Sequence, residues 1–582
     1  MFYHNGQKLD KNHLAYLLVN KDITMFKLIT TCLSLMLTVV FWVAPALAQS
    51  GGVTLLKQER NGASTQKLTA GELASLGDPL FNLVLKDHAD VTNLSEIENL
   101  IKGEEKTFVV DERIADPSPG QSRRAVLTFD GNNGGALKPN IMFSVGFNSE
   151  RFPDVQPIEA LGWDAKRSRY NYYKLDEEGT PGQLSWKFRG SSDGADTLKI
   201  QQREGTCMQC HINGAPVMKE LLFPWDNWHS FMSQVAYLKS TNPWKVTSND
   251  RIGKHLKGAE DLETDFIVPA INQFNTQRIE VSLARNNDGS PVLDSDGMKQ
   301  VIEGKRLLRP LFVTTEFNII SSPQKVGKLH PFSDAPTVGP DKAVEIPESF
   351  FLNANLISDT PPGLGMAREV QAFREFTVQP EEYKQLLTNS GVQVNGQKPG
   401  DADFAWLVPE PSHIDNNMVE QLMQQGIVTP QFVAAVIAID LETPILSKER
   451  EALLQFIPEQ FRFQPLDGGA NPLSLKRHPD DLTQKVVAAM EKASPESNSP
   501  AGKFLTLLKS DIPSATLKEQ LNAYHFRVKQ ALDNQITRPA ELERLYNLAI
   551  ARREAVLEEG TGLKALDEFS LLFPLPERRS GT

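Results

Sequence analysis

The spacing of apolar residues changes along the chain and predicts the order of its secondary structure. Between residues 107 and 188, short runs of β-branched and aromatic residues alternate with Gly, Pro, Asn and Asp clusters, a pattern typical of an antiparallel sheet. One helix is predicted before them, at residues 93–102, capped by Thr92 or Asn93 and ended at Gly103. Strands are predicted at residues 107–111, 124–129, 141–147, 170–175, 184–188 and 197–201.

The second half of the chain has a different pattern. Residues 241–390 are loop-rich, with strands predicted at 278–284 and 306–320. Residues 286–289 and 294–297 resemble calcium-loop fragments, but neither has the EF-hand glutamate, so hairpin turns are predicted. Beyond residue 390, apolar residues recur at three-to-four spacing. Helices are predicted at 416–425, 429–439, 447–455, 479–493, 515–532 and 540–558, with a polar linker at 493–502.

The strongest chemical motif is Cys207-Met208-Gln209-Cys210-His211, which has the C-x-x-C-H form of a c-type haem attachment site. Each thiol can add to one porphyrin vinyl group, and the histidine can ligate the iron from the proximal side. A redox C-x-x-C pair would belong to a thioredoxin-like βαβ unit, and no such pattern surrounds the motif. A zinc site would need a further ligand, and the chain has no second cysteine pair. One covalent haem c is therefore predicted.

The N-terminal region predicts export. Met25 is the better start, because Lys27 then forms a basic n-region before an apolar run at residues 28–43. The Ala-Leu-Ala sequence at 46–48 is a signal-peptidase site, so the mature chain is expected to begin at Gln49. An uncleaved membrane anchor is the alternative, since the apolar segment is nearly long enough to span a bilayer. Haem is attached to c-type cytochromes outside the bacterial cytoplasm, so the signal and the motif agree on a periplasmic or otherwise exported protein.

Net charge limits the partners. Cleavage after residue 48 would remove four Lys and two Asp from the 61 basic and 73 acidic residues, which leaves a net charge of −14. An acidic chain of this kind is unsuited to nucleic acid or to an anionic membrane surface. No stable membrane span is expected after signal cleavage. A redox partner protein or a small-molecule substrate is the expected partner.

The order of elements around the motif resembles one known group. Trp186-Lys187-Phe188 in a predicted strand, followed by Cys207 to His211 at the end of a β domain, is similar to the cytochrome P460 and β-type cytochrome c′ group. The similarity covers about residues 105–215. The chain departs from that group in its long C-terminal extension, and it has no lysine that matches the haem cross-link of P460 proteins.

The sixth iron ligand decides whether such a haem transfers electrons or binds small molecules. Met218 follows His211 too closely to reach the opposite face of the haem. His229 is the first candidate for the distal ligand, because it lies in an aromatic-rich segment after a longer return of the chain. A lone histidine is more often a surface or capping residue than an iron ligand. Other candidates are His255, His330, Met232, Met298 and Met366.

Together these features predict an α+β protein, with a β-rich antiparallel haem-bearing N-terminal domain, a mixed middle region and a mostly helical C-terminal region. The expected function is that of an exported monohaem c-type cytochrome with an electron-transfer or redox role. Two alternatives stay open: a haem oxidoreductase with an open distal site for peroxide, oxygen or nitrogen oxides, and a haem-gated sensor or interaction module. No catalytic residue is predicted. The expected divisions are an upstream extension (1–24), the signal peptide (25–48), the haem domain (49–240), the mixed region (241–390) and the helical region (391–582).

Overall fold

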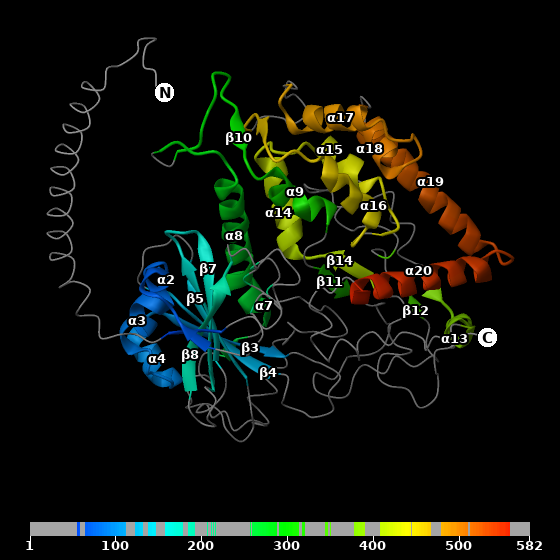
Figure 1. The fold of residues 1–582 in the computed structure, drawn as a ribbon. Coiled ribbons are helices and arrows are strands. Elements are labelled where there is room, and N and C mark those ends of the chain that lie inside the picture. The colour runs from blue at the N-terminus through cyan, green and yellow to red at the C-terminus, as the bar shows by residue number, and fades with distance from the viewer. Residues whose placement is uncertain are drawn as a thin grey trace, which may run out of the picture. The chain divides into compact units, whose positions relative to one another are not determined.

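The described part of the chain is a mixture of helices and one large sheet, as the predicted α+β class requires (Figure 1). It belongs to one compact unit, Leu55–Thr582. The predicted signal peptide and the predicted strand at 197–201 lie outside the described residues. The computed structural model describes residues 55–58, 65–111, 123–131, 138–146, 158–177, 184–192, 207, 211, 214, 216, 256–257, 259–287, 290–313, 317–320, 344–346, 350, 377–389, 408–443, 445–466, 479–509 and 513–558.

The main sheet has nine strands in the order β2-β1-β8-β7-β6-β5-β4-β3-β9. The six strands from β3 to β8 follow one another in sequence and pair antiparallel, as predicted. Parallel pairs between β1 and β8 and between β3 and β9 make the sheet mixed. The strands are β1 (Leu56–Gln58), β2 (Thr65–Lys67), β3 (Glu105–Asp111), β4 (Arg123–Phe129), β5 (Ile141–Gly146), β6 (Ile158–Asp164), β7 (Arg169–Glu177), β8 (Leu184–Ser191) and β9 (Leu256–Lys257).

Strand β6 was not predicted, because its sequence, IEALGWD, does not alternate between apolar and polar residues. Both faces of the sheet are covered at this strand, and six of its seven residues are buried. Leu161 and Trp163 point to one face, and Ala160 and Gly162 occupy the other. A strand buried on both sides loses the period of two on which the prediction relied.

Four short helical segments cover one face of the sheet: α2 (Ala70–Ala74), the π-helical turn η1 (Phe81–Leu85), α3 (Lys86–His88) and α4 (Leu94–Ile101) (Figure 1). The predicted helix at 93–102 is confirmed as α4, whose cap Asn93 accepts a hydrogen bond from the Ser95 N–H at 2.9 Å. The helix ends at Ile101, and its C-cap Lys102 has φ 52°, one residue before the expected glycine. The Trp186 indole of β8 donates to the Val91 carbonyl at 2.8 Å and fixes this layer to the sheet.

The opposite face is covered by α7 (Ala259–Leu262), the π-helical turn η6 (Glu263–Ile267) and α8 (Val268–Val281). The strand predicted at 278–284 is therefore wrong, since its first half is the last turn of α8. The β-branched residues Ile279 and Val281 suggested a strand, but Ile271, Phe274 and Ile279 are buried at helical spacing. Tertiary packing overrides the local propensity of these residues.

The strand predicted at 306–320 is also largely wrong. Residues 304–312 form helix α9 (Gly304–Phe312), and only β11 (Phe317–Ile320) is extended. In α9 the buried residues Leu307, Leu308, Leu311 and Phe312 lie on one side of the helix. The same run of apolar residues also suits a strand, which is why a strand was predicted.

A hairpin lies between α8 and α9. Arg285 pairs with Pro291 across it, and its turn ends at Gly297, which has φ 76°. The hairpin interpretation of residues 294–297 is confirmed, since the Asp294 carboxylate accepts the N–H groups of Asp296 and Met298.

The helical region has its own core, built from the end of α8, from α9 and from the helices beyond residue 412. Three aromatic rings, Phe312, Phe432 and Phe504, contact one another edge to face with centroids 5.6 to 6.4 Å apart. All six helices predicted here are confirmed, and the predicted linker at 493–502 ends in the start of α18. The elements are α14 (His413–Gln424), α15 (Pro430–Ile437), α16 (Lys448–Glu451) with its 3-10 continuation η8 (Ala452–Phe456), α17 (Leu482–Ala493), α18 (Pro500–Lys509), α19 (Pro513–Asp533) and α20 (Arg538–Glu558).

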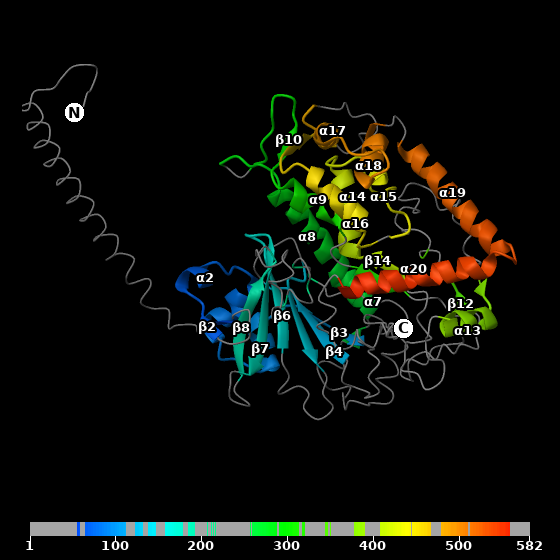
Figure 2. The ribbon, with the colours of Figure 1, turned by 45° about the vertical axis from the view of Figure 1, so that its right-hand side comes forward.

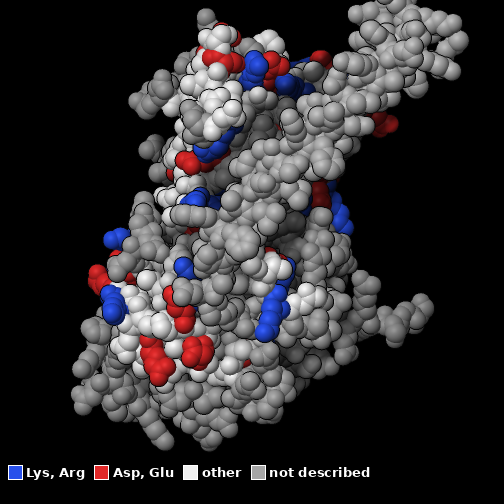
Figure 3. All heavy atoms as spheres, turned by 60° about the vertical axis from the view of Figure 1, so that its left-hand side comes forward, with Lys and Arg blue, Asp and Glu red and all other residues white. Residues whose placement is uncertain are grey.

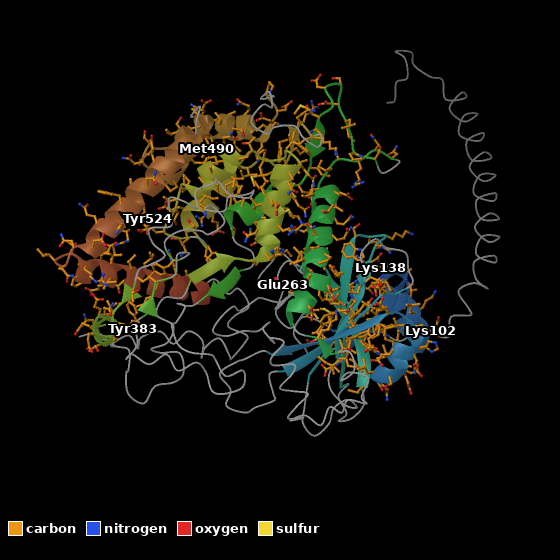
Figure 4. All side chains as sticks on the ribbon, turned by 180° about the vertical axis from the view of Figure 1, so that it is seen from behind. Lys102, Lys138, Glu263, Tyr383, Met490 and Tyr524 are labelled. Carbon is orange, nitrogen blue, oxygen red and sulfur yellow. The ribbon has the colours of Figure 1, made fainter. Side chains whose placement is uncertain are left out.

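The last two helices form a hairpin (Figures 2 and 4). Charged side chains attach this hairpin to neighbouring segments. Arg538, at the start of α20, makes a two-pronged ion pair with Glu382 of α13 (Pro380–Asn389) at 2.5 and 2.9 Å. Arg552 is buried and donates to the carbonyls of Glu442 and Phe350. No helix in the described part of the chain is both long and apolar enough to cross a membrane.

Candidate haem attachment site

Two residues of the predicted haem motif, Cys207 and His211, are among the described residues. The His211 N–H donates to the Cys207 carbonyl at 2.9 Å, which is the hydrogen bond of one α-helical turn. The Gly214 N–H donates to the His211 carbonyl at 3.0 Å. Positions i, i+3 and i+4 of a helical turn share one side, and these are the positions that a C-x-x-C-H motif uses. Cys210 lies outside the described residues.

The end of this turn is fixed to the sheet by Gly214. Its φ of 70° suits glycine, and a Cβ atom there would lie 2.5 Å from the Ser192 Cα atom. Ser192 is itself held by Tyr170 of β7, whose N–H donates to the Ser192 hydroxyl at 2.9 Å and whose carbonyl accepts the Ser192 N–H at 2.8 Å. The motif thus rests against a backbone that the sheet already orders, and only glycine allows the approach.

Tyr172 of β7 contacts the motif at two points. Its hydroxyl donates to the Gly214 carbonyl at 2.7 Å, and its ring lies 5.1 Å from the His211 ring at 50°. Tyr172 is buried within the sheet, so it gives the imidazole a rigid neighbour. The sequence alone did not single out this residue, because only the fold brings β7 against a segment nearly forty residues further along.

Cys207 is half-buried against an apolar cluster between the sheet and α8. Within the cluster the Tyr170 ring lies 4.7 Å from Trp163 and 6.2 Å from Phe274. We call this cluster the aromatic wall. Its buried members are Phe108, Val126, Leu161, Trp163, Tyr170, Tyr172, Leu262, Phe266, Ile267, Ala270, Ile271, Phe274 and Ile414.

Cations lie over two rings of the aromatic wall. The Lys257 amine is 6.0 Å from the Phe108 ring centre, and the Arg278 guanidinium is 5.5 Å from that of Phe274. Burial lowers the pKa of Arg278 to about 10, against the opposing effect of Asp415, and the group stays charged at neutral pH. On the face drawn in Figure 3, acidic and basic side chains of the described residues lie interspersed.

These residues fit a covalent haem. A covalently attached haem needs a large apolar surface for its ring. It also needs a thiol and an imidazole on one side of a turn, and polar or cationic groups near its two carboxylates. The aromatic wall, the Cys207 to His211 turn and the cations over Phe108 and Phe274 are residues of these kinds, although the Lys257 amine is also paired with Asp265 at 3.1 Å. The Tyr170 hydroxyl, which is buried and has no hydrogen-bond partner among the described residues, is a further polar group in the wall.

Of the candidates for the sixth ligand, only Met298 is among the described residues. Met298 is buried in the hairpin after α8, directly before Lys299, which pairs with Leu293 across the hairpin. It is not a member of the aromatic wall. The structure therefore does not bring Met298 to Cys207. The other candidates, His229, Met232, His255, His330 and Met366, lie outside the described residues, as does Met218.

A buried carboxylate supports the site from the other face of β7. Asp78 accepts hydrogen bonds from the Phe81 N–H at 2.9 Å, from the Asn171 amide at 2.7 Å and from the Tyr173 hydroxyl at 2.5 Å. Burial raises the pKa of Asp78, while the hydrogen bonds from Tyr173 and Asn171 oppose this rise. Asp78 was not predicted as a site residue, although an aspartate followed by proline before an apolar segment is a helix-start signal.

Comparisons with known proteins add no further identification. No family model matches the chain, and neither a curated protein nor a solved structure matches it. The similarity to the cytochrome P460 group therefore stays a prediction. Among the described residues, no three His, Cys, Asp or Glu side chains are grouped so that they could hold a metal ion between them.

Proposed function

We propose that this chain is an exported monohaem c-type cytochrome with an electron-transfer or redox function, and that Cys207, Cys210 and His211 hold the haem. One observation carries the proposal. The C-x-x-C-H segment makes a helical hydrogen bond between its first and last residues, and its first cysteine packs against a wall of aromatic side chains.

When bound, the haem would supply an iron centre that changes oxidation state. The residues of this chain hold and shield it: Tyr172 restrains the His211 ring, and Gly214 fixes the turn to the end of β8. The aromatic wall excludes water from one side. A low-polarity surround disfavours the extra positive charge of the ferric state, so it is expected to raise the reduction potential.

The test is whether the haem is covalent. Haem held by thioether bonds stays with the protein in acidified acetone, whereas haem held by coordination alone is extracted. The full chain, expressed with the c-type haem assembly machinery of a bacterial periplasm, is expected to keep its haem in this solvent. Extraction of all haem, or purification of a stable folded protein without haem, would contradict the proposal. Optical and EPR spectra of the same sample distinguish five-coordinate from six-coordinate iron.

His211→Gly separates iron ligation from covalent attachment. The thioethers are made by the cysteines, so this variant is expected to retain part of its covalent haem but to show an altered ferric spectrum. Added imidazole is expected to restore much of the original spectrum, because it can occupy the position of the missing ring. His88→Gly, at an exposed histidine of α3, is the control and should leave the spectrum unchanged. An unchanged spectrum in His211→Gly would show that the iron has other axial ligands.

A haem-gated interaction module is a second candidate function, favoured by the position of α8. Its first half contributes Ile271 and Phe274 to the aromatic wall, and Ile279 near its end belongs to the core of the helical region. Between them Asn275 donates to the Ile414 carbonyl at 2.8 Å, so α8 is also tied to α14. One rigid helix therefore contacts both the proposed haem site and the helical region.

This second function predicts that a change at the iron alters the stability of the contact between α8 and α14. Hydrogen exchange of the α14 amides, measured for the ferric, ferrous and carbon monoxide-treated protein, is expected to differ among these states. The amides of α4, which covers the opposite face of the sheet, serve as the internal control. Equal exchange of α14 in all states would leave the electron-transfer or redox function as the sole proposal.

A further inference from the structure

The Tyr170 hydroxyl differs from those of its two neighbouring tyrosines on β7. Tyr172 donates to the Gly214 carbonyl, and Tyr173 donates to Asp78, whereas the Tyr170 hydroxyl has no partner among the described residues. All three side chains are almost fully buried. Burial raises the pKa of Tyr170, so this hydroxyl is neutral and available as a donor. An unpaired buried hydroxyl is unfavourable, which indicates that a group outside the polypeptide accepts its hydrogen bond.

The position of Tyr170 connects this hydroxyl with the proposed haem site. Tyr170 and Tyr172 are two residues apart on β7 and so face the same side of the sheet, about 7 Å apart along the strand. Tyr172 contacts His211, and Tyr170 belongs to the aromatic wall against which Cys207 packs. Both backbone hydrogen bonds of Tyr170 go to Ser192, the residue on which Gly214 rests. The ring is therefore rigidly placed beside the motif.

The charge nearby indicates which acceptor fits. The Tyr170 ring neighbours Phe274, and the Arg278 guanidinium lies over that same ring. The charge of Arg278 is opposed by Asp415, so it adds only to the general field of the wall, and the neutral Tyr170 donor itself suits an anionic oxygen. Tyr170 also lies on the sheet face that contacts the proximal histidine, whereas a small molecule on the iron would occupy the opposite side of the porphyrin. A carboxylate at the porphyrin edge satisfies both conditions.

We propose that the Tyr170 hydroxyl donates a hydrogen bond to a propionate carboxylate of the haem attached at Cys207 and Cys210. This inference rests on the proposed function, because the acceptor belongs to the haem. It assigns Tyr170 as a haem-binding residue in addition to the motif. The hydrogen bond orients the porphyrin edge against the wall and holds the carboxylate in its ionised form.

Tyr170→Phe tests this assignment, because it removes the hydroxyl and keeps the ring. In resonance Raman spectra of the ferrous haem protein, the propionate bending band is expected to shift to lower frequency, while the iron–histidine stretch stays unchanged. The urea midpoint of the haem protein is expected to fall, since a hydrogen bond to a charged group is lost. Tyr173→Phe is the matched control: it removes a buried hydroxyl from the other face of β7 and should leave the propionate band in place.

Two results would overturn the assignment. An unchanged propionate band together with a higher urea midpoint would show that the hydroxyl has no partner in the haem protein, because removing an unpaired polar group stabilises the fold. A shift of the iron–carbon stretch in the carbon monoxide complex, without a change in the propionate band, would place the hydroxyl beside the iron ligand instead. Haem retention in acidified acetone is measured on the same samples, so failure of covalent attachment is seen separately.

Discussion

Replacing Cys207 and Cys210 together by alanine is expected to abolish covalent haem in the purified protein. Each thiol supplies one thioether bond, and the doubly substituted chain has no thiol left at the motif. The single variants are expected to keep part of their haem through the remaining bond. The measurement is haem staining after denaturing electrophoresis, combined with the optical spectrum of the haem released in alkaline pyridine.

The third cysteine provides a matched control. Cys32 lies in the predicted signal peptide, so Cys32→Ala is expected to leave haem content unchanged. Equal covalent haem in the doubly substituted and unaltered chains would show that the haem is attached elsewhere. Loss of haem in Cys32→Ala alone would instead require the predicted signal cleavage to be wrong, because that residue would then be part of the mature protein.

The double variant is also expected to be less stable than the haem protein. Trp163 and Phe274 are buried by protein alone, so the expected loss comes from Cys207, which is only half-buried and would lose its apolar neighbour. Exposing apolar surface costs about 25 cal/mol per Å². Lower thermal stability with normal secondary structure is the expected result by circular dichroism.

The sequence predicted the sheet well where one face of a strand carries polar residues. Strands β3, β4, β5, β7 and β8 were predicted to within a few residues, since turn residues separate them clearly. Predictions failed where burial removed the pattern, as in β6, and where β-branched residues such as Ile279 lie in a helix. Local propensity is a weak guide at both positions, because packing decides the conformation.

The candidate site was predictable only in its covalent part. The spacing of Cys207 and His211 is a local signal, so a motif is enough to find it. Tyr172, Gly214 and Ser192 act through contacts between β7, the end of β8 and the motif, and no local pattern indicates such contacts. Tyr170 carries no motif either, and its importance follows only from a buried hydroxyl that lacks a partner among the described residues.

Asp78→Ala is expected to destabilise the protein by about 3 to 5 kcal/mol, the largest effect expected of any substitution outside the motif. Three buried donors would lose their acceptor: the Phe81 N–H, the Asn171 amide and the Tyr173 hydroxyl. Each buried donor left unpaired costs about 1 to 3 kcal/mol, and partial relaxation lowers their sum. The measurement is the free energy of unfolding from urea titration, followed by circular dichroism.

Asp176→Ala is the control for this substitution. Asp176 lies on β7, the strand that Asp78 contacts, and is partly exposed, with its carboxylate 3.9 Å from the Lys174 amine. A surface pair of this kind contributes at most about 1 kcal/mol, so the control should change stability little. The stability of Asp78→Asn should fall between those of the two alanine variants, because it keeps one acceptor oxygen but adds donors that face Asn171.

Asp78 contacts β7 from the face opposite Tyr172. The loss of stability in Asp78→Ala should therefore be accompanied by weaker restraint of the motif, measured as faster hydrogen exchange at His211. Equal stability of Asp78→Ala and Asp176→Ala would show that the three donors find other acceptors and that this network does not hold β7 in place.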